Sequence, residues 1–417
     1  MSTADDAKAS NSRQPRSLWR NRDFLLLWSG QAVSTIGTQV STLALPLLVL
    51  ALLHSPTQAG FIAAVRSLPY LIFSLPAGAL IDRWDRKRMM IMCDTARCLA
   101  YGSIPFAFAV GRLTLVQLYV VALVEGTAFV FFNIAEVACL PRVVTAEQLP
   151  QANALNQSSE AVGFLIGPGL AGFLIGLAQT IVAGAMLAYA VDAVTYLVSV
   201  ASLGIIRMPF QVARALGGRR SLWAEIMEGV QFLWTHSRLR AMAALTLSTQ
   251  VLFGPFTLVL VVLMRDALHA DPPTIGLLFS LSSIGALVGA GVAPWVKGRL
   301  GFGRIIIGTT LLQALGVVII AIATSPLVVV VGGVIVLFAV PIFNVASVSY
   351  RLSLIPDVLQ GRVNSVYRLF ALSGVPLGTA VSGLLLGVLG PRAELWIIAL
   401  GTTISALAIS VTGVRRA

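Results

Sequence analysis

The chain has 417 residues, of which 57% are hydrophobic and only 11% are charged, and its formal net charge is +12. Soluble domains contain about 25% charged residues, so this composition excludes a water-soluble enzyme and, because it is so apolar, a disordered chain. Basic residues in excess would suggest nucleic acid in a soluble protein, but in so apolar a chain they indicate loops beside a membrane. We therefore expect a lipid bilayer around the chain and no nucleic acid as a partner.

Apolar runs long enough to cross a bilayer recur twelve times along the chain. A transmembrane helix needs about 20 apolar residues, and continuous runs favour helices over a barrel, whose strands would alternate. The sequence thus predicts an all-α integral membrane protein. The expected spans are 24–53, 59–81, 89–111, 113–140, 159–178, 181–206, 241–265, 275–297, 303–324, 326–350, 363–389 and 393–413.

The longest polar stretch, residues 207–240, separates the first six spans from the last six. From Leu222 to Leu233 its apolar residues recur at helical spacing, which predicts an amphipathic helix lying on the membrane surface. We therefore expect two pseudo-symmetric six-helix bundles joined by a linker. The expected parts are a tail (1–23), a bundle (24–206), the linker (207–240), a second bundle (241–413) and a tail (414–417).

The basic residues predict the orientation, because cytoplasmic loops are enriched in Lys and Arg. With the N-terminus inside, the inner loops hold most of them, and the outer turns hold only Arg112, Arg265 and Arg392. The first residues are polar and basic, without the apolar region of a signal peptide. We predict a multi-pass protein of the plasma (inner) membrane with both termini in the cytoplasm.

The two halves resemble each other in sequence. At nearly one common offset, His54 pairs with His269, Gly60 with Gly276, and Pro141 with Pro356. Because six spans is an even number, both copies start on the same side of the membrane, which makes the repeat parallel. The path of a transported molecule is then expected between the halves, near the middle of the bilayer.

The segment between spans two and three has a distinctive pattern, Gly78-Ala-Leu-Ile-Asp82-Arg83-Trp-Asp85-Arg86. It resembles the loop signature of the major facilitator superfamily, with an Asp where that signature has its second Gly. Glycine permits close helix approach, and the charges can hold helix ends together, so we interpret the segment as a gating latch. The alternative is a plain basic loop. The expected latch residues are Gly78, Asp82, Arg83, Arg86, Asp94 and Arg97.

Further motifs sharpen the resemblance over nearly the whole chain. They are Asn21-Arg22-Asp23-Phe24, Leu45-Pro46-Leu47, Leu140-Pro141, Asn153-Ala154-Leu155, Gly361-Arg362-Val363 and Pro376-Leu377-Gly378. Together they resemble the macrolide-efflux and siderophore (enterobactin)-exporter branch. That branch implies a secondary transporter that exports hydrophobic or amphiphilic small molecules, by proton antiport with alternating access. The alternative is an importer or facilitator of a small metabolite on the same fold.

Span five contains Gly163, Gly167, Pro168 and Gly172 in a pattern similar to the superfamily's antiporter signature. Glycines four residues apart let helices pack closely, and a proline permits a bend. In the family this bend accompanies export. Ordinary helix packing is the alternative.

Charged residues inside a membrane span are costly and are therefore functional candidates. Glu125 in span four and Asp192 in span six are our candidates for proton coupling, and Arg66 in span two can neutralise either one or meet a substrate. Asp94 and Arg97 can pair on one helix face. The alternative for each of these residues is an internal ion pair without a role in turnover.

Two positions depart from the family pattern. Thr38 stands where relatives often carry an Asp in span one, and Ala122 stands where the superfamily has an Arg in span four. We assign no acidic residue to a span of the C-terminal half. Any proton coupling is therefore expected to rest on the N-terminal half.

Polar and aromatic residues in spans one, two, four, seven and ten suit a cavity for an amphiphilic ligand. The expected cavity residues are Arg66, Gln39, Phe132, Asn133, Gln250, Phe253, Phe343 and Asn344, with packing or lipid contact as the alternative for each. The three cysteines and three histidines have no metal-ligand spacing, so we expect neither metal nor cofactor. No nucleotide loop or nucleophile elbow is found. We expect a monomeric transporter, not an enzyme, with a small molecule and protons as partners.

Overall fold

The computed structural model describes residues 18–81, 84–208, 210, 222–356 and 359–411. All of its regular elements in this part of the chain are helices. They are η1 (Leu18–Arg20), α1 (Arg22–Leu53), α2 (Pro56–Ile81), α3 (Arg86–Ala109), α4 (Leu115–Val143), α5 (Leu149–Gly176), α6 (Ile181–Ile205), α7 (Leu222–Thr235), α8 (Ser237–Phe253), α9 (Phe256–Val262), η2 (Leu263–Ala267), α10 (Pro272–Arg299), α11 (Phe302–Ala321), α12 (Pro326–Leu354) and α13 (Gln360–Val411).

Within these described residues, nine helical stretches are long and apolar enough to cross a membrane. One of them is α13, whose 52 residues are two helices joined at Gly390, where φ is 78°. Pro391 follows directly and cannot donate the next helical hydrogen bond. This joint separates the two spans predicted at 363–389 and 393–413.

Polar side chains cap the starts of several helices, close to the starts of the predicted spans. Asn21 accepts a hydrogen bond from the Phe24 amide at the start of α1, and Asp85 does the same for the Arg88 amide at the start of α3. Such caps satisfy amide groups that have no partner inside the helix. The helix ends therefore follow local sequence signals in addition to hydrophobicity.

Two of the expected spans differ from the observed helices by more than four residues. The span predicted at 159–178 is part of α5, which begins ten residues earlier, at Leu149. Hydropathy did not reveal this start because the first turns of α5 are polar. The span predicted at 241–265 is divided after Phe253 into α8, α9 and η2. Gly254 and Pro255 lie at this division, and Pro255 has no amide hydrogen for a continuous helix.

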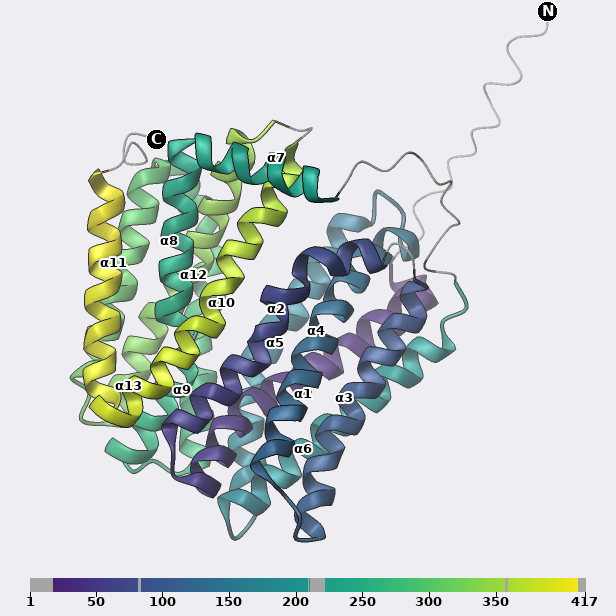
Figure 1. The fold of residues 1–417 in the computed structure, drawn as a ribbon, viewed down its shortest axis with the longest axis vertical. Helices are drawn as coiled ribbons and strands as arrows, with labels where there is room; N and C mark the ends of the chain where they lie inside the picture. The colour runs from purple at the N-terminus through teal and green to yellow at the C-terminus, as the bar shows by residue number, and fades with distance from the viewer. Residues whose placement is uncertain (1–17, 82–83, 209, 211–221, 357–358, 412–417) are drawn as a thin grey trace, which may run out of the picture.

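The helices lie in two groups, α1–α6 and α8–α13, with α7 across one end of the second group (Figure 1). Within the first group α1 packs on α5 and α6, and α2 packs on α4; within the second, α12 packs on α10 and α11. The groups touch through α2 with α13 and α5 with α10. They lie close at the end opposite α7 and separate toward the end that carries it (Figure 1).

The contacts between the two groups depend on glycine. An added Cβ on Gly60 of α2 would overlap the Cα of Gly383 in α13, and one on Gly276 of α10 would overlap the carbonyl of Pro168 in α5. Gly276 also faces Gly172. Gly60 and Gly276 are one of the pairs matched in the sequence repeat, so equivalent residues make equivalent contacts in the two halves.

Backbone conformation shows the same correspondence. His54 ends α1 with φ 51°, and His269 follows η2 with φ 52°. Among described non-glycine residues, only these two have positive φ, a conformation that costs roughly 1–3 kcal/mol. The internal repeat therefore extends to the turn that ends each first helix.

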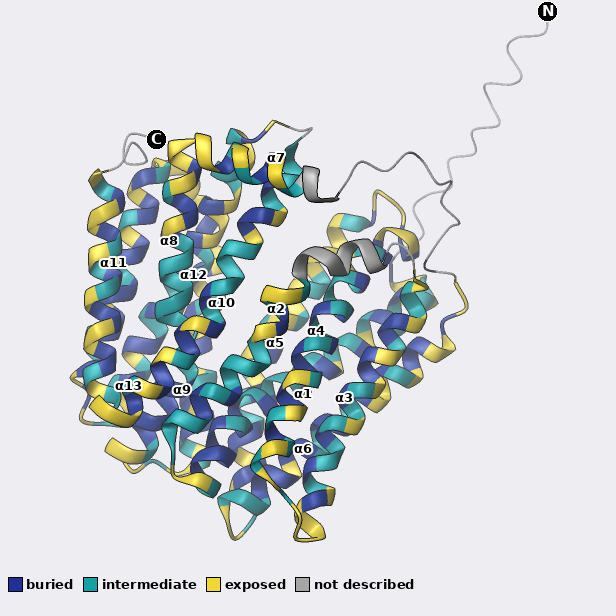
Figure 2. Ribbon diagram, viewed as in Figure 1, coloured by how far each residue is buried: buried dark blue, intermediate teal, exposed yellow. Residues whose placement is uncertain are grey.

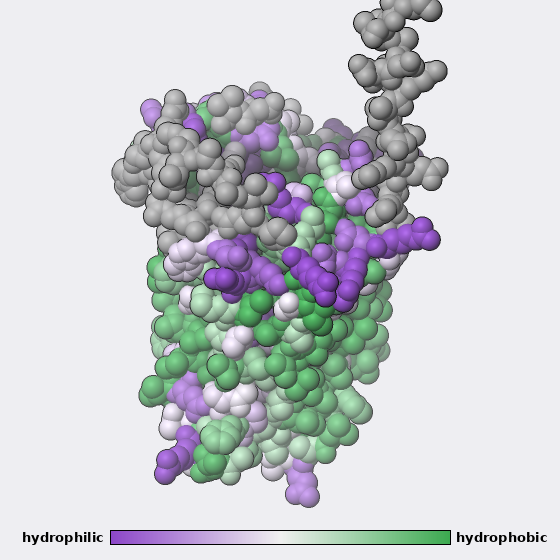
Figure 3. Space-filling model, turned by 90° about the vertical axis from the view of Figure 1, so that its right-hand side faces the viewer, coloured by the Kyte–Doolittle hydropathy of each residue, from purple (hydrophilic) through white to green (hydrophobic). Residues whose placement is uncertain are grey.

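Buried residues line the faces where helices meet, and exposed residues lie on the outer faces and at the ends (Figure 2). The outer faces are nevertheless apolar: Phe106 and Leu327 are each 70% exposed, and Val388 is 82% exposed. One side view shows a broad hydrophobic area between hydrophilic residues near its two ends (Figure 3). Apolar patches of this size mark a lipid-facing surface.

Candidate functional site

A cavity of about 320 Å³ lies where the two groups of helices meet. Its walls come from α1, α2 and α4 on one side, and from the α8–α9 junction, α9 and α13 on the other. Its lining is mostly apolar with a few polar groups, as in sites for small molecules. The polar and aromatic lining residues are Thr38, Gln39, Thr42, Arg66, Ser67, Tyr70, Glu125, Phe129, Thr257 and Thr379.

An ion pair between α2 and α4 forms the charged part of the cavity wall. Arg66 donates from Nε to Glu125 Oε2 at 2.6 Å and from Nη2 to Oε1 at 3.3 Å. Its side chain is 24% exposed, whereas that of Glu125 is 2% exposed. Gly126 permits the close approach, because an added Cβ there would overlap the Arg66 carbonyl. The guanidinium therefore faces the cavity and the carboxylate lies behind it.

A row of hydroxyl groups on α1 connects this ion pair to the interior of the first group. Arg66 Nη1 donates to Thr42 Oγ1 at 3.3 Å, and Thr42 in turn donates to the Thr38 carbonyl at 2.7 Å. The Thr38 hydroxyl shares a 2.9 Å hydrogen bond with Tyr196 of α6. Thr38 and Thr42 are four residues apart and so lie on one face of α1.

A second ion pair lies deeper among α3, α4 and α6. Arg97 Nη1 is 3.4 Å from Asp94 Oδ1, and the Ser199 hydroxyl donates to Asp94 Oδ2 at 2.6 Å. The Arg97 guanidinium also lies over the rings of Phe129, Phe132 and Tyr196, at 5.2–5.4 Å from their centroids. Such cation–π contacts partly replace water around a buried cation. Phe129 separates this pair from the cavity, since its ring also lines the cavity.

Asp192 of α6 has two hydroxyl partners. Ser41 donates to its Oδ2 and Thr195 donates to its Oδ1. Asp192 is buried and does not line the cavity. The structure thus brings Glu125 to the cavity wall and keeps Asp192 one helix away from it.

The expected latch is only partly described. Asp82 and Arg83 lie outside the described residues, and Gly78 belongs to the last turns of α2. Arg86 donates to the Ala138 carbonyl at 2.8 Å and so ties α3 to α4. Lys87, the next residue, donates to the Ile206 carbonyl after α6. The basic residues after Asp85 therefore hold helix ends within the first group.

The glycines of α5 make close contacts on two sides. An added Cβ on Gly163 or Gly167 would overlap Thr35 or Gln39 of α1, and one on Gly172 would overlap the start of α10. The Gly169 amide donates to Ser280 of α10 at 2.9 Å. Pro168 lies within α5 between these contacts. The motif thus lets α5 pack against both groups of helices.

The other expected cavity residues lie in different surroundings. Only Gln39 and Arg66 of that set line the cavity. Phe132 and Phe343 are buried in apolar clusters. The remaining ones lie on their helices away from the cavity wall, with Asn344 exposed and Asn133, Gln250 and Phe253 partly buried.

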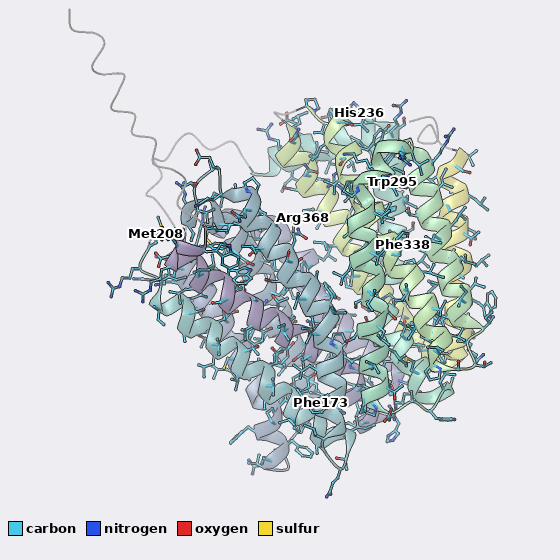
Figure 4. All side chains as sticks on the ribbon, turned by 180° about the vertical axis from the view of Figure 1, so that it is seen from behind. Phe173, Met208, His236, Trp295, Phe338 and Arg368 are labelled. Carbon is cyan, nitrogen blue, oxygen red and sulfur yellow. The ribbon has the colours of Figure 1, made fainter. Side chains whose placement is uncertain are left out.

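Sequence reasoning overlooked several cavity residues that carry hydroxyl groups. Ser67, Tyr70, Thr257 and Thr379 all line the cavity. The signal that was available is a hydroxyl residue in an otherwise apolar run. Arg368 of α13, a basic residue inside the predicted span 363–389, is exposed between the two groups of helices (Figure 4).

The expectation that the C-terminal half has no acidic residue within a span is wrong. Glu394 lies in the second part of α13 and is only 2% exposed. It was overlooked because it stands at the second position of the predicted span 393–413. Across the described residues, no group of three or more His, Cys, Asp or Glu side chains could hold a metal ion.

Comparison with known proteins relates the chain to transporters. Residues 15–417 match the family described as transmembrane secretion effector. The chain is 26% identical over 380 residues to the multidrug efflux pump Tap of Mycolicibacterium fortuitum, covering 89% of this chain and 90% of that protein. It is 23% identical over 270 residues to macrolide efflux protein A of Streptococcus pyogenes, covering 64% of each.

Solved structures with the same fold cover nearly the whole chain. The nucleoside transporter NupG superposes with a TM-score of 0.74 at 13% identity, covering 93% of this chain and 98% of that one. A bacterial homologue of the iron transporter ferroportin, in an inward-facing state, gives 0.73 at 18% identity and covers 94% and 98%. At such low identity these likenesses establish the fold alone.

Proposed function

We propose a function for this chain from the premise that it belongs to the transmembrane secretion effector family, whose members are transporters and not enzymes. This membership and the efflux-pump relatives confirm the expected resemblance to the major facilitator superfamily and its macrolide-efflux branch. The chain is a multi-pass membrane protein of the efflux class. We infer that its helices form twelve spans in two six-helix bundles.

The proposed activity is export of amphiphilic, drug-sized molecules by alternating access. The observation that carries it is the cavity between α1, α2 and α4 on one side and α9 and α13 on the other. A cavity between two groups of helices changes its access when the groups rock about their contacts. The glycine contacts of Gly60 and Gly276 lie at the closed end and would part in the opposite state.

The lining supports an amphiphilic substrate. Tyr70 and Phe129 supply aromatic surface, Arg66 supplies a charge, and threonines supply hydrogen bonds. The volume of about 320 Å³ is at the small end of the roughly 300–1,000 Å³ found for ligand sites. A larger substrate would therefore need the groups to separate further.

Proton antiport is proposed through Glu125. When Glu125 accepts a proton from the cavity, it loses its charge, and its ion pair with Arg66 is lost. The Arg66 guanidinium can then bind an anionic or polar group of the substrate. Proton and substrate therefore compete for the same ion pair, which links their movements in opposite directions. Asp192 remains the second candidate, because it lies one helix away and is held by hydroxyl groups.

The proposed orientation has α7 and both termini in the cytoplasm. The basic residues around α7, such as Arg238 and Arg240, are exposed and belong on the cytoplasmic face. The structure would then have its separated end toward the cytoplasm and its glycine contacts toward the outside. We propose the plasma membrane as its location and a monomer as the working unit.

An accumulation assay tests the proposal. The chain would be expressed in bacteria that lack their own multidrug pumps, and uptake of ethidium and of a macrolide would be measured. We expect lower accumulation than in cells with an empty vector, and loss of the difference when an uncoupler collapses the proton gradient. Glu125→Gln should also abolish it, with Glu147→Gln, an exposed carboxyl, as the matched control. Higher accumulation on expression would reverse the proposed direction.

A further inference from the structure

Glu394 is a buried acid in the C-terminal half with no described counter-charge. It is 2% exposed, and its Oε2 atom has no hydrogen-bond partner. It stands four residues after Gly390, in the first turn of the second part of α13. A buried carboxylate without a counter-charge is unfavourable, and binding a proton would remove that charge.

The neighbouring polar group is also without a partner. Ser382, in the first part of α13, is 2% exposed and its Oγ atom makes no hydrogen bond. Its hydroxyl lies beside the Glu394 carboxyl and is directed toward it, although the oxygens do not meet at the distance and angle of a full hydrogen bond. Two buried oxygens from the two parts of α13 thus face one another across the Gly390 joint.

The charged groups on the surrounding helices are engaged or belong to other regions. Arg392, two residues before Glu394, donates to the Ala323 carbonyl at 2.9 Å. Two charged groups on the helices packed against α13 are in ion pairs: Arg66 of α2 pairs with Glu125, and Glu228 of α7 pairs with Arg362. The other described charged groups on these helices lie at helix starts, Arg238 and Arg240 in α8 and Arg304 in α11. None of the ion pairs among the described residues includes Glu394.

The site lies between the cavity and the contact that joins the two groups of helices. Thr379 lines the cavity, three residues before Ser382 on the same face of α13. On the other side, Gly383 packs on Gly60 of α2, and its carbonyl accepts from Thr57 at 2.9 Å. Opening of this contact would give water access to Ser382 and Glu394 from that side. While the contact is closed, the open space closest to Ser382 is the cavity lined by Thr379.

We propose that Glu394 and Ser382 form a second proton-binding site, in the C-terminal half, that takes a proton from outside when the Gly60–Gly383 contact is open. This rests on the proposed proton antiport and extends it beyond Glu125. Glu394 Oε2 forms an O–H bond with a proton from water outside and becomes neutral. The same bond breaks when the proton leaves toward the cavity past Ser382 and Thr379. One carboxylate oxygen suffices for a proton, whereas the three side-chain oxygens of Glu394 and Ser382 are too few for Ca²⁺, which takes six to eight.

Infrared spectroscopy of the purified full-length protein in lipid nanodiscs at neutral pH tests the site without any substrate. We expect Glu394→Gln to remove one C=O band of a protonated carboxylic acid, and Ser382→Ala to shift the frequency of that band. Glu147→Gln, at an exposed carboxyl, should change only ionised-carboxylate bands. Loss of a carboxylate band in Glu394→Gln, or no shift in Ser382→Ala, would overturn the proposal. Circular dichroism checks that each variant folds. If Glu394→Gln does not fold, the band shift in Ser382→Ala still tests whether Glu394 is protonated beside Ser382.

Two further measurements separate this site from its alternatives. Disappearance of the acid band on addition of NaCl, with choline chloride as control, would make the ligand a metal cation and reject the proton. In proteoliposomes, Glu394→Gln should reduce ethidium transport driven by a pH gradient by at least about tenfold, yet retain exchange down an ethidium gradient. Equal losses of both would reject a coupling role. If the wild type moves no dye at all, the proposed export fails while the infrared result still decides the proton site.

Discussion

The two halves of the molecule share their helix plan but differ in their polar interiors. Both end their first helical unit at a histidine with positive φ, and both contact the other half through an equivalent glycine. Yet among the described residues, the first half contains three buried acids that all have partners, Glu125, Asp94 and Asp192. The described part of the second half has one buried acid, Glu394, with an oxygen that has no partner.

If the proposed proton antiport is correct, this difference favours a division of work between the halves on a common scaffold. A paired acid such as Glu125 can change partner, so the first half is suited to exchanging protons and substrate at the cavity. An unpaired acid beside a contact between the halves responds instead to whether that contact is dry or wet. Under the proposed alternating access, the matched glycine contacts would let both halves move alike, while the few charged positions differ between the halves.

The largest expected effect is from breaking the cavity ion pair. Arg66→Ala leaves Glu125 buried without a counter-charge, which costs about 3–5 kcal/mol when a buried pair loses one member. We expect a strong fall in melting temperature and no transport. Adding Glu125→Gln removes the stranded charge and should restore much of the stability, though not the transport.

A thermal denaturation series of the two single variants and the double variant in detergent measures this. If the double variant melts as low as Arg66→Ala, the loss comes from packing and not from the unpaired charge. In that case the contrast between a paired first half and an unpaired second half would lose its main support.

The next effect concerns the matched glycines. Gly60→Ala and Gly276→Ala each place a methyl group against backbone of the other half, an overpacking that costs typically 1–3 kcal/mol. We expect both to favour the state in which the contacts are parted. Gly102→Ala is the control, because its added methyl would meet nothing closer than Ala193 Cβ at 3.8 Å.

Accessibility of a cysteine placed at Thr57, labelled from outside in whole cells, reports this shift. Equal increases for Gly60→Ala and Gly276→Ala would support equivalent contacts. An increase for one variant alone would mean that the two halves do not move symmetrically, despite their matched sequence.

The sequence predicted the helices better than the site, for a physical reason. Hydrophobic length and capping residues such as Asn21 and Asp85 act locally, so α1 and α3 begin within three residues of the predicted spans. A cavity depends on which helix faces meet. Gln39 and Arg66 stood out through their polarity, whereas Thr379 and Thr257 resemble any threonine in an apolar helix until α13 and α9 are brought against α1 and α2.

Ionisable residues show the same limit. Charged residues are costly inside a bilayer, and this identified Arg66, Glu125 and Asp192 as candidates. The pairing of Arg66 with Glu125 could not be predicted, because it depends on how α2 packs against α4. Glu394 was missed because its position near a span end does not reveal whether water reaches it. Its 2% exposure is a property of the folded chain and could not be read from the sequence.

A smaller effect is expected from the hydroxyl pair between α1 and α6. Tyr196→Phe removes one partner of the 2.9 Å hydrogen bond with Thr38 and keeps the ring over Arg97. A neutral hydrogen bond contributes about 0.5–1.5 kcal/mol net, so we expect a modest drop in melting temperature and a few-fold loss of ethidium efflux. Thr38→Val and the double variant complete a cycle. Strictly additive losses would show that Thr38 and Tyr196 act independently.

The smallest effect is expected at the end of the second half that carries α7. Arg362 Nη1 lies 2.6 Å from Glu228 Oε2 and joins α13 to α7, but the two side chains are 22% and 46% exposed. Exposed pairs contribute roughly 0.2–1 kcal/mol and weaken with salt. Glu228→Gln should therefore lower the melting temperature slightly, and less so at high ionic strength, with Glu147→Gln as the exposed control. If Glu228→Gln lowered the melting temperature as much as Arg66→Ala, the Arg362–Glu228 ion pair would stabilise the protein as strongly as the cavity ion pair. The contrast between the polar interiors of the two halves would then fail.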